Sequence, residues 1–171
     1  MRIRYAILGL VLCAVSINAQ DRNTEPPKLV VGLIVDQMRF DFLERYQEHF
    51  GEGGFKRLMR EGYSFENTHY NYVPTVTAAG HASIYTGVTP SIHGVNDNSW
   101  YERESNRMVS NVGDTAVRIV GSAVERTYGY SPVRLVTGTI TDQLRLESNS
   151  EAKVISVALK DRGAILPGGH S

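Results

Sequence analysis

A continuous apolar run over residues 29–35 constrains the fold of this 171-residue sequence more than any other feature. The run is rich in β-branched side chains, does not alternate with polar residues, and stops at Asp36. Such a run is typical of a strand buried on both faces, as in a parallel sheet covered by helices. Residues 154–159 repeat the pattern and end at Lys160. The sequence therefore predicts an α/β fold with a mostly parallel central sheet.

Helical patterns between and after these runs give the alternation that is expected of an α/β domain. Apolar spacing predicts helices over residues 38–50, 55–61, 78–85 and 132–146. Residues 63–72 and 117–120 are predicted to contain short strands, and residues 90–100 a loop. Ligands of parallel sheets bind beyond the carboxyl ends of the strands. The polar residues that follow the two apolar runs are therefore the first candidates for a site.

Asp36 is the first of these candidates. A carboxylate directly after a long apolar run is costly to bury unless something charged meets it. A divalent cation is one solution, because aspartate oxygen is a good zinc ligand. The other is capping of the helix that follows, a common role for aspartate at such a junction. Position alone leaves both roles open.

Thr77 stands at the predicted start of the helix over residues 78–85. A phosphate or an alkoxide there would face free backbone N–H groups and the positive end of the helix dipole. A threonine hydroxyl is a weak nucleophile until a base or a metal removes its proton. No base is obvious in the local sequence, so a metal ion is the natural activator. Plain helix capping is the alternative, and Thr75 is the competing hydroxyl.

Three further polar side chains have the chemistry to contact a phosphate group. The amide of Asn98 can donate to a phosphate oxygen, although asparagine also favours turns. Lys160 offers a point charge and Arg162 a planar fork, which together suit an oxyanion clamp. The alternative for the last two is a solvated loop that contains an Asp161–Arg162 ion pair.

The first 19 residues have the layout of a secretory signal peptide. Arg2 and Arg4 precede an apolar run over residues 5–15, which is too short to span a bilayer comfortably, and Ala19 suits cleavage. Residues 20–28 are then a linker, and residues 29–171 belong to the folded domain. We expect export to the periplasm or beyond the cell, with no stable membrane partner. A buried N-terminal helix is the alternative.

Other sequence features narrow the function. Cys13, the only cysteine, falls within the segment to be removed, so the mature chain has no disulfide and no thiolate site. The 18 basic and 18 acidic residues are scattered and balanced, so nucleic acid is not an expected partner. The five histidines show no metal-binding spacing, and none is assigned as a ligand. No G-x-S-x-G elbow supports a Ser/His/Asp hydrolase.

Several motifs occur in order along residues 29–170. They are Val35-Asp36-Gln37-Met38-Arg39, Gly51-Glu52-Gly53-Gly54-Phe55-Lys56-Arg57-Leu58, Pro74-Thr75-Val76-Thr77 with Gly80-His81, Tyr85-Thr86-Gly87 with Pro90-Ser91-Ile92-His93-Gly94, Thr141-Asp142-Gln143-Leu144, and Leu159-Lys160-Asp161-Arg162. Together they resemble the alkaline phosphatase superfamily, in particular its flavobacterial PafA-type phosphomonoesterases. Ordered motifs at matching separations are more specific than any one of them.

The resemblance implies hydrolysis of small-molecule phosphate monoesters at a site with two zinc ions. Asp36 corresponds to a ligand of one zinc, and Thr77 to a nucleophile that binds the same zinc and becomes phosphothreonine. Asn98 corresponds to an asparagine that binds the phosphoryl oxygens. Lys160 and Arg162 correspond to a pair that stabilises the transferred group. The second zinc is implied to stabilise the leaving oxygen and then to activate water.

The sequence departs from the resemblance in length, because relatives of this type are much longer and carry most of their zinc ligands later in the chain. We therefore expect an N-terminal portion of a longer enzyme that is inactive alone. A nucleotide pyrophosphatase-type phosphodiesterase is the first alternative, although Lys160 and Arg162 favour a dianionic monoester. A non-catalytic exported fragment that binds anions is the second. Arylsulfatases are disfavoured because no C/S-x-P-x-R pattern is present.

Overall fold

The computed structural model describes residues 27–121 and 128–170. The predicted signal peptide with Cys13, and most of the predicted linker, lie outside these residues. The chain packs as two units, Met1–Leu33 and Ile34–Ser171. Of the first unit, residues 27–33 are described, and they form neither helix nor strand. No helix in the described ranges combines the length and the apolar character needed to cross a bilayer.

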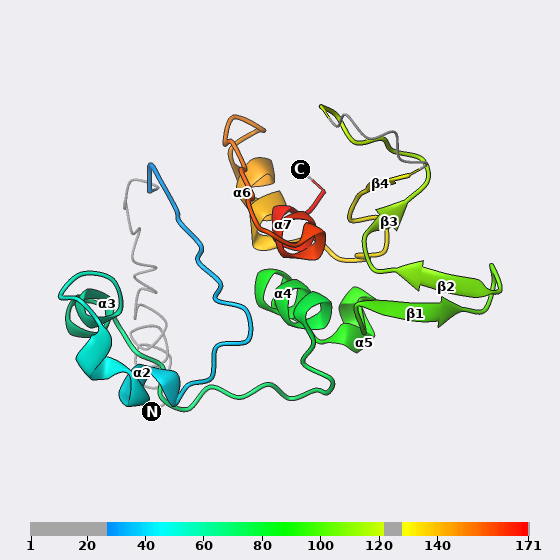
Figure 1. The fold of residues 1–171 in the computed structure, drawn as a ribbon. Helices are drawn as coiled ribbons and strands as arrows, with labels where there is room; N and C mark the ends of the chain where they lie inside the picture. Colours follow the sequence, from blue (N-terminus) through cyan, green and yellow to red (C-terminus); the bar gives the residue numbers. More distant parts are fainter. Residues whose placement is uncertain (1–26, 122–127, 171) are drawn as a thin grey trace, which may run out of the picture. The chain divides into compact units, whose positions relative to one another are not determined.

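The second unit combines short helices with antiparallel strand pairs (Figure 1). The described helices are α2 (Phe42–Arg45), the 3₁₀ helix η1 (Gln47–His49), α3 (Phe55–Glu61), α4 (Thr77–Thr86), α5 (Pro90–His93), α6 (Ile140–Glu147) and α7 (Asp161–Gly168). Strand β1 (Ser99–Glu102) pairs with β2 (Arg107–Ser110), with Trp100 opposite Val109. Strand β3 (Gly113–Asp114) pairs with β4 (Gly129–Tyr130), with Asp114 opposite Gly129.

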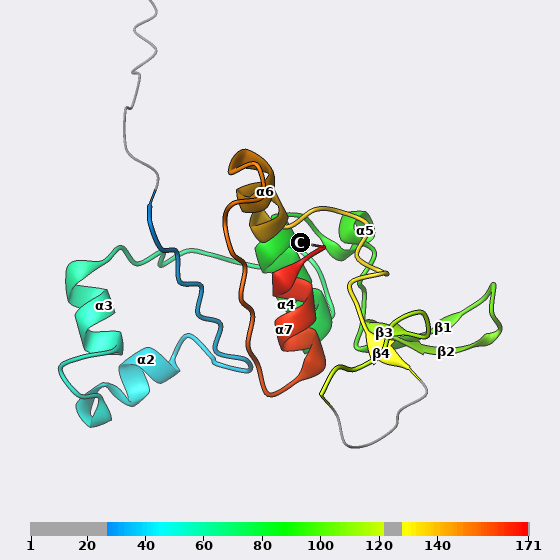
Figure 2. The same ribbon diagram turned by 90° about the horizontal axis from the view of Figure 1, so that it is seen from above.

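Helices α4 and α7 pack against each other and form the centre of this unit (Figures 1 and 2). The facing surface of α4 is made of small side chains, since Ala78 and Ala82 are fully buried there. Gly163 of α7 lies at this contact, where a Cβ would stand 3.8 Å from the His81 ring, an ordinary van der Waals distance, and 3.1 Å from the Ala158 side chain. Small residues allow this close approach, and Leu166 fills the remaining space as a fully buried side chain.

The end of α7 is fixed against the start of α6 by Asp142. Thr139 and Asp142 form a capping box, in which the Thr139 hydroxyl accepts from the Asp142 amide and the Asp142 carboxylate accepts from the Thr139 amide. The carboxylate also accepts from the His170 amide at 2.6 Å. Burial raises the pKa of the Asp142 carboxyl, but these hydrogen bonds outweigh burial and hold that pKa below its ordinary range.

The two predicted buried strands are not formed in the described chain. Residues 29–35 and 154–159 have no strand partner among the described residues, and their apolar side chains are exposed, Val31 at 77% and Val157 at 88%. The prediction that each run is a buried strand is therefore wrong for the described residues. An apolar run specifies a strand only when another strand completes its backbone hydrogen bonds, and among residues 27–121 and 128–170 no strand pairs with either run.

Local predictions were more successful where helix ends carry their own signals. The helices predicted over residues 55–61 and 78–85 are confirmed as α3 and α4. The predicted helix over residues 38–50 is broken into α2 and η1, and that over residues 132–146 begins only at the capping box of α6. No strand forms within residues 63–72 or 117–120, while α5 and β1 replace the predicted loop over residues 90–100. Helix α7 was not predicted.

Candidate active site

Asp36 lies in a tight turn directly after the first apolar run. The Met38 amide donates to the Val35 carbonyl at 3.4 Å across this turn. Gln37 has a φ of 61°, a left-handed conformation that is uncommon for any residue other than glycine. The next helix, α2, has Asp41 at its N-cap. Asp36 is therefore not a helix cap, and that alternative is wrong.

Thr77 is the first residue of α4, and Val76 occupies the N-cap position without a side-chain hydrogen bond. The Thr77 hydroxyl does not cap the helix but donates to Asp36 Oδ2 at 3.3 Å. Asn98 supplies the cap instead, because its Oδ1 accepts from the Ala78 amide at 3.0 Å. The capping alternative for Thr77 is therefore wrong, and its hydroxyl is left to polar groups outside the helix.

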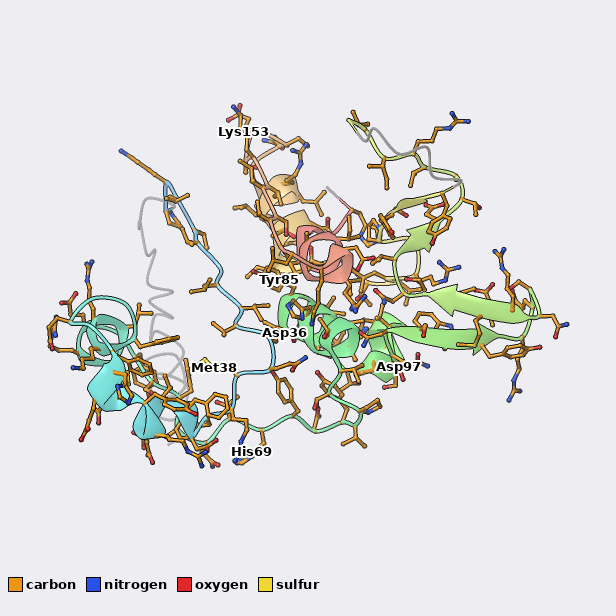
Figure 3. All side chains as sticks on the ribbon, in the orientation of Figure 1. Asp36, Met38, His69, Tyr85, Asp97 and Lys153 are labelled. Atoms are coloured by element: carbon orange, nitrogen blue, oxygen red, sulfur yellow. The ribbon has the colours of Figure 1, made fainter. Side chains whose placement is uncertain are left out.

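Lys160 completes a cluster with Asp36 and Thr77. Its Nζ donates to Asp36 Oδ2 at 2.5 Å and lies 3.5 Å from Thr77 Oγ1. Figure 3 shows Asp36 on the non-helical segment that passes beside α4. The hydrogen bond from Lys160 and its charge outweigh the effect of partial burial and hold the pKa of the Asp36 carboxyl below its ordinary value. Three segments that are distant in sequence therefore meet around the Thr77 hydroxyl.

Asn98 and Arg162 are placed differently from this cluster. Asn98 is half-buried, holds the first turn of α4 through its side-chain oxygen, and has its own carbonyl bound by the Asn111 side chain at 2.5 Å. Arg162 is the second residue of α7, and its guanidinium pairs with Asp161 at 3.2 Å. Within the described ranges it makes no hydrogen bond to Thr77. The predicted Asp161–Arg162 pair is thus present, at a helix start rather than in a loop.

His81 is a site residue to which the sequence analysis gave no role. Its Nδ1 lies 2.8 Å from the Thr77 carbonyl oxygen, which can only accept, so this nitrogen carries the proton. The ring is 7% exposed. The spacing of His81, four residues after Thr77, could have indicated this role, because residues four apart lie on one face of a helix. His81 holds the backbone of Thr77 and lies against Gly163 of α7.

A pocket of about 260 Å³ opens beside this cluster. Its polar lining includes Asp36, Thr77 and His81, and its apolar lining includes Val76 and Ile84. A volume of this size suits a small group, because drug-sized ligands occupy pockets of roughly 300 to 1,000 Å³. The pocket therefore has room for a small polar ligand next to the Thr77 hydroxyl.

Asp36 Oδ2 and Thr77 Oγ1 are suited to hold one metal ion together. Two oxygens at about 2.0 Å from a tetrahedral zinc ion lie about 3.3 Å apart, and these two oxygens are 3.3 Å apart. This set of metal ligands is incomplete, because the described residues contain no group of three or more His, Cys, Asp or Glu side chains that could hold a metal ion. The donor pair fits a metal ion and leaves most of its coordination to other groups.

Comparison with known proteins identifies the family. The family model for type I phosphodiesterase / nucleotide pyrophosphatase matches residues 30–152. Alkaline phosphatase PafA of Elizabethkingia meningoseptica is 50% identical over 166 residues, which are 96% of this chain and 30% of that protein. Alkaline phosphatase PhoV of Synechococcus elongatus is 46% identical over 183 residues, which are 100% of this chain and 33% of that protein. The chain thus spans about a third of the length of these curated relatives.

Solved structures give the same result. The crystal structure of wild-type alkaline phosphatase PafA matches with a TM-score of 0.83 and 53% identity, over 86% of this chain and 29% of that chain. A variant of that enzyme matches with the same TM-score, and its substitutions fall on a threonine, an asparagine, a lysine and an arginine. The predicted fold class is confirmed by this match. The chain therefore belongs to the type I phosphodiesterase / nucleotide pyrophosphatase family and to the PafA-like part of the alkaline phosphatase superfamily, whose α/β fold it shares.

Proposed function

We propose that the full-length protein hydrolyses phosphate monoesters, with Thr77 as the nucleophile and phosphothreonine as the intermediate. One observation carries the proposal. The Thr77 hydroxyl lies at the first residue of a helix, within 3.3 Å of the Asp36 carboxylate and 3.5 Å of the Lys160 ammonium. A hydroxyl between a carboxylate and a cation, with helix amides beside it, suits attack on a phosphoryl group.

The proposed reaction is a two-step displacement at phosphorus, in which each residue of the site has a separate role. In the first step Thr77 Oγ1 attacks phosphorus, and the bond from phosphorus to the leaving oxygen breaks. In the second step water attacks phosphorus, the bond to Thr77 breaks, and inorganic phosphate leaves. Lys160 and the amides of the first turn of α4 stabilise the negative charge on the phosphoryl oxygens during both steps. Asn98 positions that turn through its bond to the Ala78 amide.

Removal of the Thr77 proton requires more than the neighbouring carboxylate. Asp36 accepts the hydrogen bond from this hydroxyl, but its pKa is held low by Lys160, which makes it a weak base. Asp36 and Thr77 would hold a metal ion, and we propose zinc, with two ions in the complete enzyme. A metal ion held by this pair would supply the positive charge that lowers the pKa of the Thr77 hydroxyl.

The solved variant of alkaline phosphatase PafA supports the choice of residues. Its four substituted residue types recur here in the same order and at the same spacings along the chain, as Thr77, Asn98, Lys160 and Arg162. The wild-type enzyme has the same fold over 86% of this chain. The same four positions are therefore our proposed nucleophile and phosphoryl-binding groups.

A phosphodiesterase is the second candidate, because the family model that matches residues 30–152 is described as a type I phosphodiesterase / nucleotide pyrophosphatase. The cation at Thr77 favours a monoester, whose phosphoryl group carries more negative charge than that of a diester. Arg162 can add to this preference only if it leaves Asp161, with which it pairs at 3.2 Å.

The two candidates differ in what removal of these cations should do. We expect Lys160→Ala and Arg162→Ala, assayed in the full-length protein at saturating zinc, to lower kcat/KM for an aryl phosphate monoester about tenfold more than for the matching diester, which corresponds to about 1.4 kcal/mol. Lys153→Ala, a change at an exposed lysine, is the control. Equal losses on both substrates would favour the diesterase.

We also propose export, on the strength of the signal-like segment over residues 1–19. Amino-terminal sequencing of the protein from its source cells tests this directly. A mature protein that begins near Gln20 agrees with the proposal, and retention of Met1 contradicts it.

A further inference from the structure

The Lys160 ammonium lies on the same two oxygens that are suited to hold a metal ion. Its Nζ is 2.5 Å from Asp36 Oδ2 and 3.5 Å from Thr77 Oγ1, and those two oxygens are 3.3 Å apart. This ion pair joins residues that are 124 positions apart in the sequence. Lys160 therefore already neutralises the carboxylate that a metal ion would bind.

The three distances limit how far a metal ion can lie from this ammonium. An ion about 2.0 Å from both oxygens lies at most about 3.6 Å from Nζ, wherever it sits around the pair. Positive charges at such a separation repel strongly in a partly buried site. The lysine has a flexible four-carbon stem, whereas Asp36 and Thr77 are fixed in a tight turn and in the first turn of a helix.

We infer that Lys160 is an exchangeable cation, which holds Asp36 and Thr77 together in the metal-free protein and moves onto the substrate phosphoryl group when a metal ion binds. The inference rests on the proposed function, because it requires the metal site at Asp36 and Thr77. It adds that Lys160 competes with the metal ion. Metal binding then frees the ammonium for substrate, so that one event completes both the nucleophile and the phosphoryl site.

Other cations near the site do not fit this role. Arg162 pairs with Asp161, and Arg39, which lines the pocket, pairs with Asp41 at 2.9 Å. In the described part of the chain, Lys160 is the basic side chain that forms an ion pair with Asp36. Both partners are partly exposed, with side chains 43% and 30% accessible, so water can solvate the ammonium as it leaves.

The test is the zinc affinity of the metal-stripped full-length protein, measured by competition with a chromophoric chelator. Lys160→Met keeps an unbranched apolar stem, one heavy atom shorter than lysine, and removes the charge. We expect this variant to bind zinc at least about tenfold more tightly than wild type, since an adjacent charge is removed. Lys153→Met is the matched control, because Lys153 is exposed on the segment between α6 and α7 (Figure 3), and it should leave the affinity unchanged.

Two outcomes would overturn the inference, and they are distinguishable. If wild type binds zinc and hydrolyses monoesters but Lys160→Met binds zinc equally or more weakly, the exchange is wrong and the proposed function stands. If wild type binds no zinc, both are wrong. A second measurement guards against misfolding of the variant. In stripped protein, the thermal midpoints of Lys160→Met, Asp36→Asn and the double variant should be non-additive, because both changes remove the same Lys160–Asp36 ion pair.

Discussion

Thr77→Ala separates the chemical role of this hydroxyl from its structural role. Among the residues that the structure describes, the hydroxyl makes long hydrogen bonds, at 3.3 Å to Asp36 and 3.5 Å to Lys160, and it caps no backbone amide. Its removal should therefore cost no more than about 1 kcal/mol of folding free energy. Part of that loss is offset, because alanine has the higher helix propensity at this first helical position. The folded structure should survive the substitution.

The loss of turnover in Thr77→Ala should be much larger than its loss of folding free energy. Without Oγ1 no phosphothreonine can form, and we expect kcat for a chromogenic phosphate monoester to fall at least about 10⁴-fold, which corresponds to about 5.5 kcal/mol of activation free energy. This exceeds the structural cost several-fold, so unfolding cannot account for it. Thr77→Ser keeps a hydroxyl at the same place and should retain measurable turnover.

The assay compares steady-state rates with acid-quenched trapping of the phosphorylated peptide by mass spectrometry. Thr75→Ala is the matched control, because Thr75 lines the same pocket. We expect it to keep most of the activity and to be labelled on Thr77. Equal loss of activity in both alanine variants, or label on Thr75 in wild type, would refute the assignment of the nucleophile.

Three further predictions follow from side chains around the site. Asn98→Asp keeps the oxygen that caps α4 but replaces the amide donor with a negative charge, so it should lower kcat/KM and leave the thermal midpoint near wild type. Asn98→Ala removes the cap as well and should lower both kcat/KM and the midpoint. Equal midpoints in the two variants would contradict the cap. Burial lowers the pKa of His93 from its ordinary value of 6.5, and the fully buried ring accepts from the Val95 amide, so folding favours neutral His93. The resulting stability is present above about pH 6.5 and is lost as the pH falls from there toward the lowered pKa, and His93→Gln should flatten this part of a thermal midpoint against pH profile. Gly169→Ala should cost about 2 to 4 kcal/mol of unfolding free energy in denaturant melts, because φ is 69° and a Cβ would lie 2.6 Å from the Asp142 carboxylate. Gly168→Ala is the control and should be close to neutral, because the nearest contact of its Cβ is at 3.5 Å.

The apolar runs show where sequence patterns alone mislead. Residues 29–35 have the composition of a buried strand, yet Val31 is 77% exposed and has no strand partner in the described chain. A helix satisfies its backbone within one segment, so α3 and α4 were predictable from spacing and terminal glycines. A strand satisfies its backbone through a neighbour, and the run itself does not contain that neighbour.

The sequence by itself determined the chemistry that is available, namely a carboxylate after an apolar run, a hydroxyl at a helix start, and paired cations at 160 and 162. It also identified the superfamily, because several ordered motifs carry more information than any single residue. It left open whether Asp36 and Thr77 are helix caps, since a cap and a metal ligand use the same side chains at the same kind of position.

Only the tertiary structure decided that question. Asp36 and Thr77 are 41 residues apart, and Thr77 and Lys160 are 83 apart, so no local pattern relates them. They meet because small buried residues on α4 let α7 pack closely, which brings Lys160, the residue before α7, to the first turn of α4. Asn98 caps that turn and so leaves the Thr77 hydroxyl free of the helix. Contacts of this kind depend on packing across the whole unit, which local sequence does not specify.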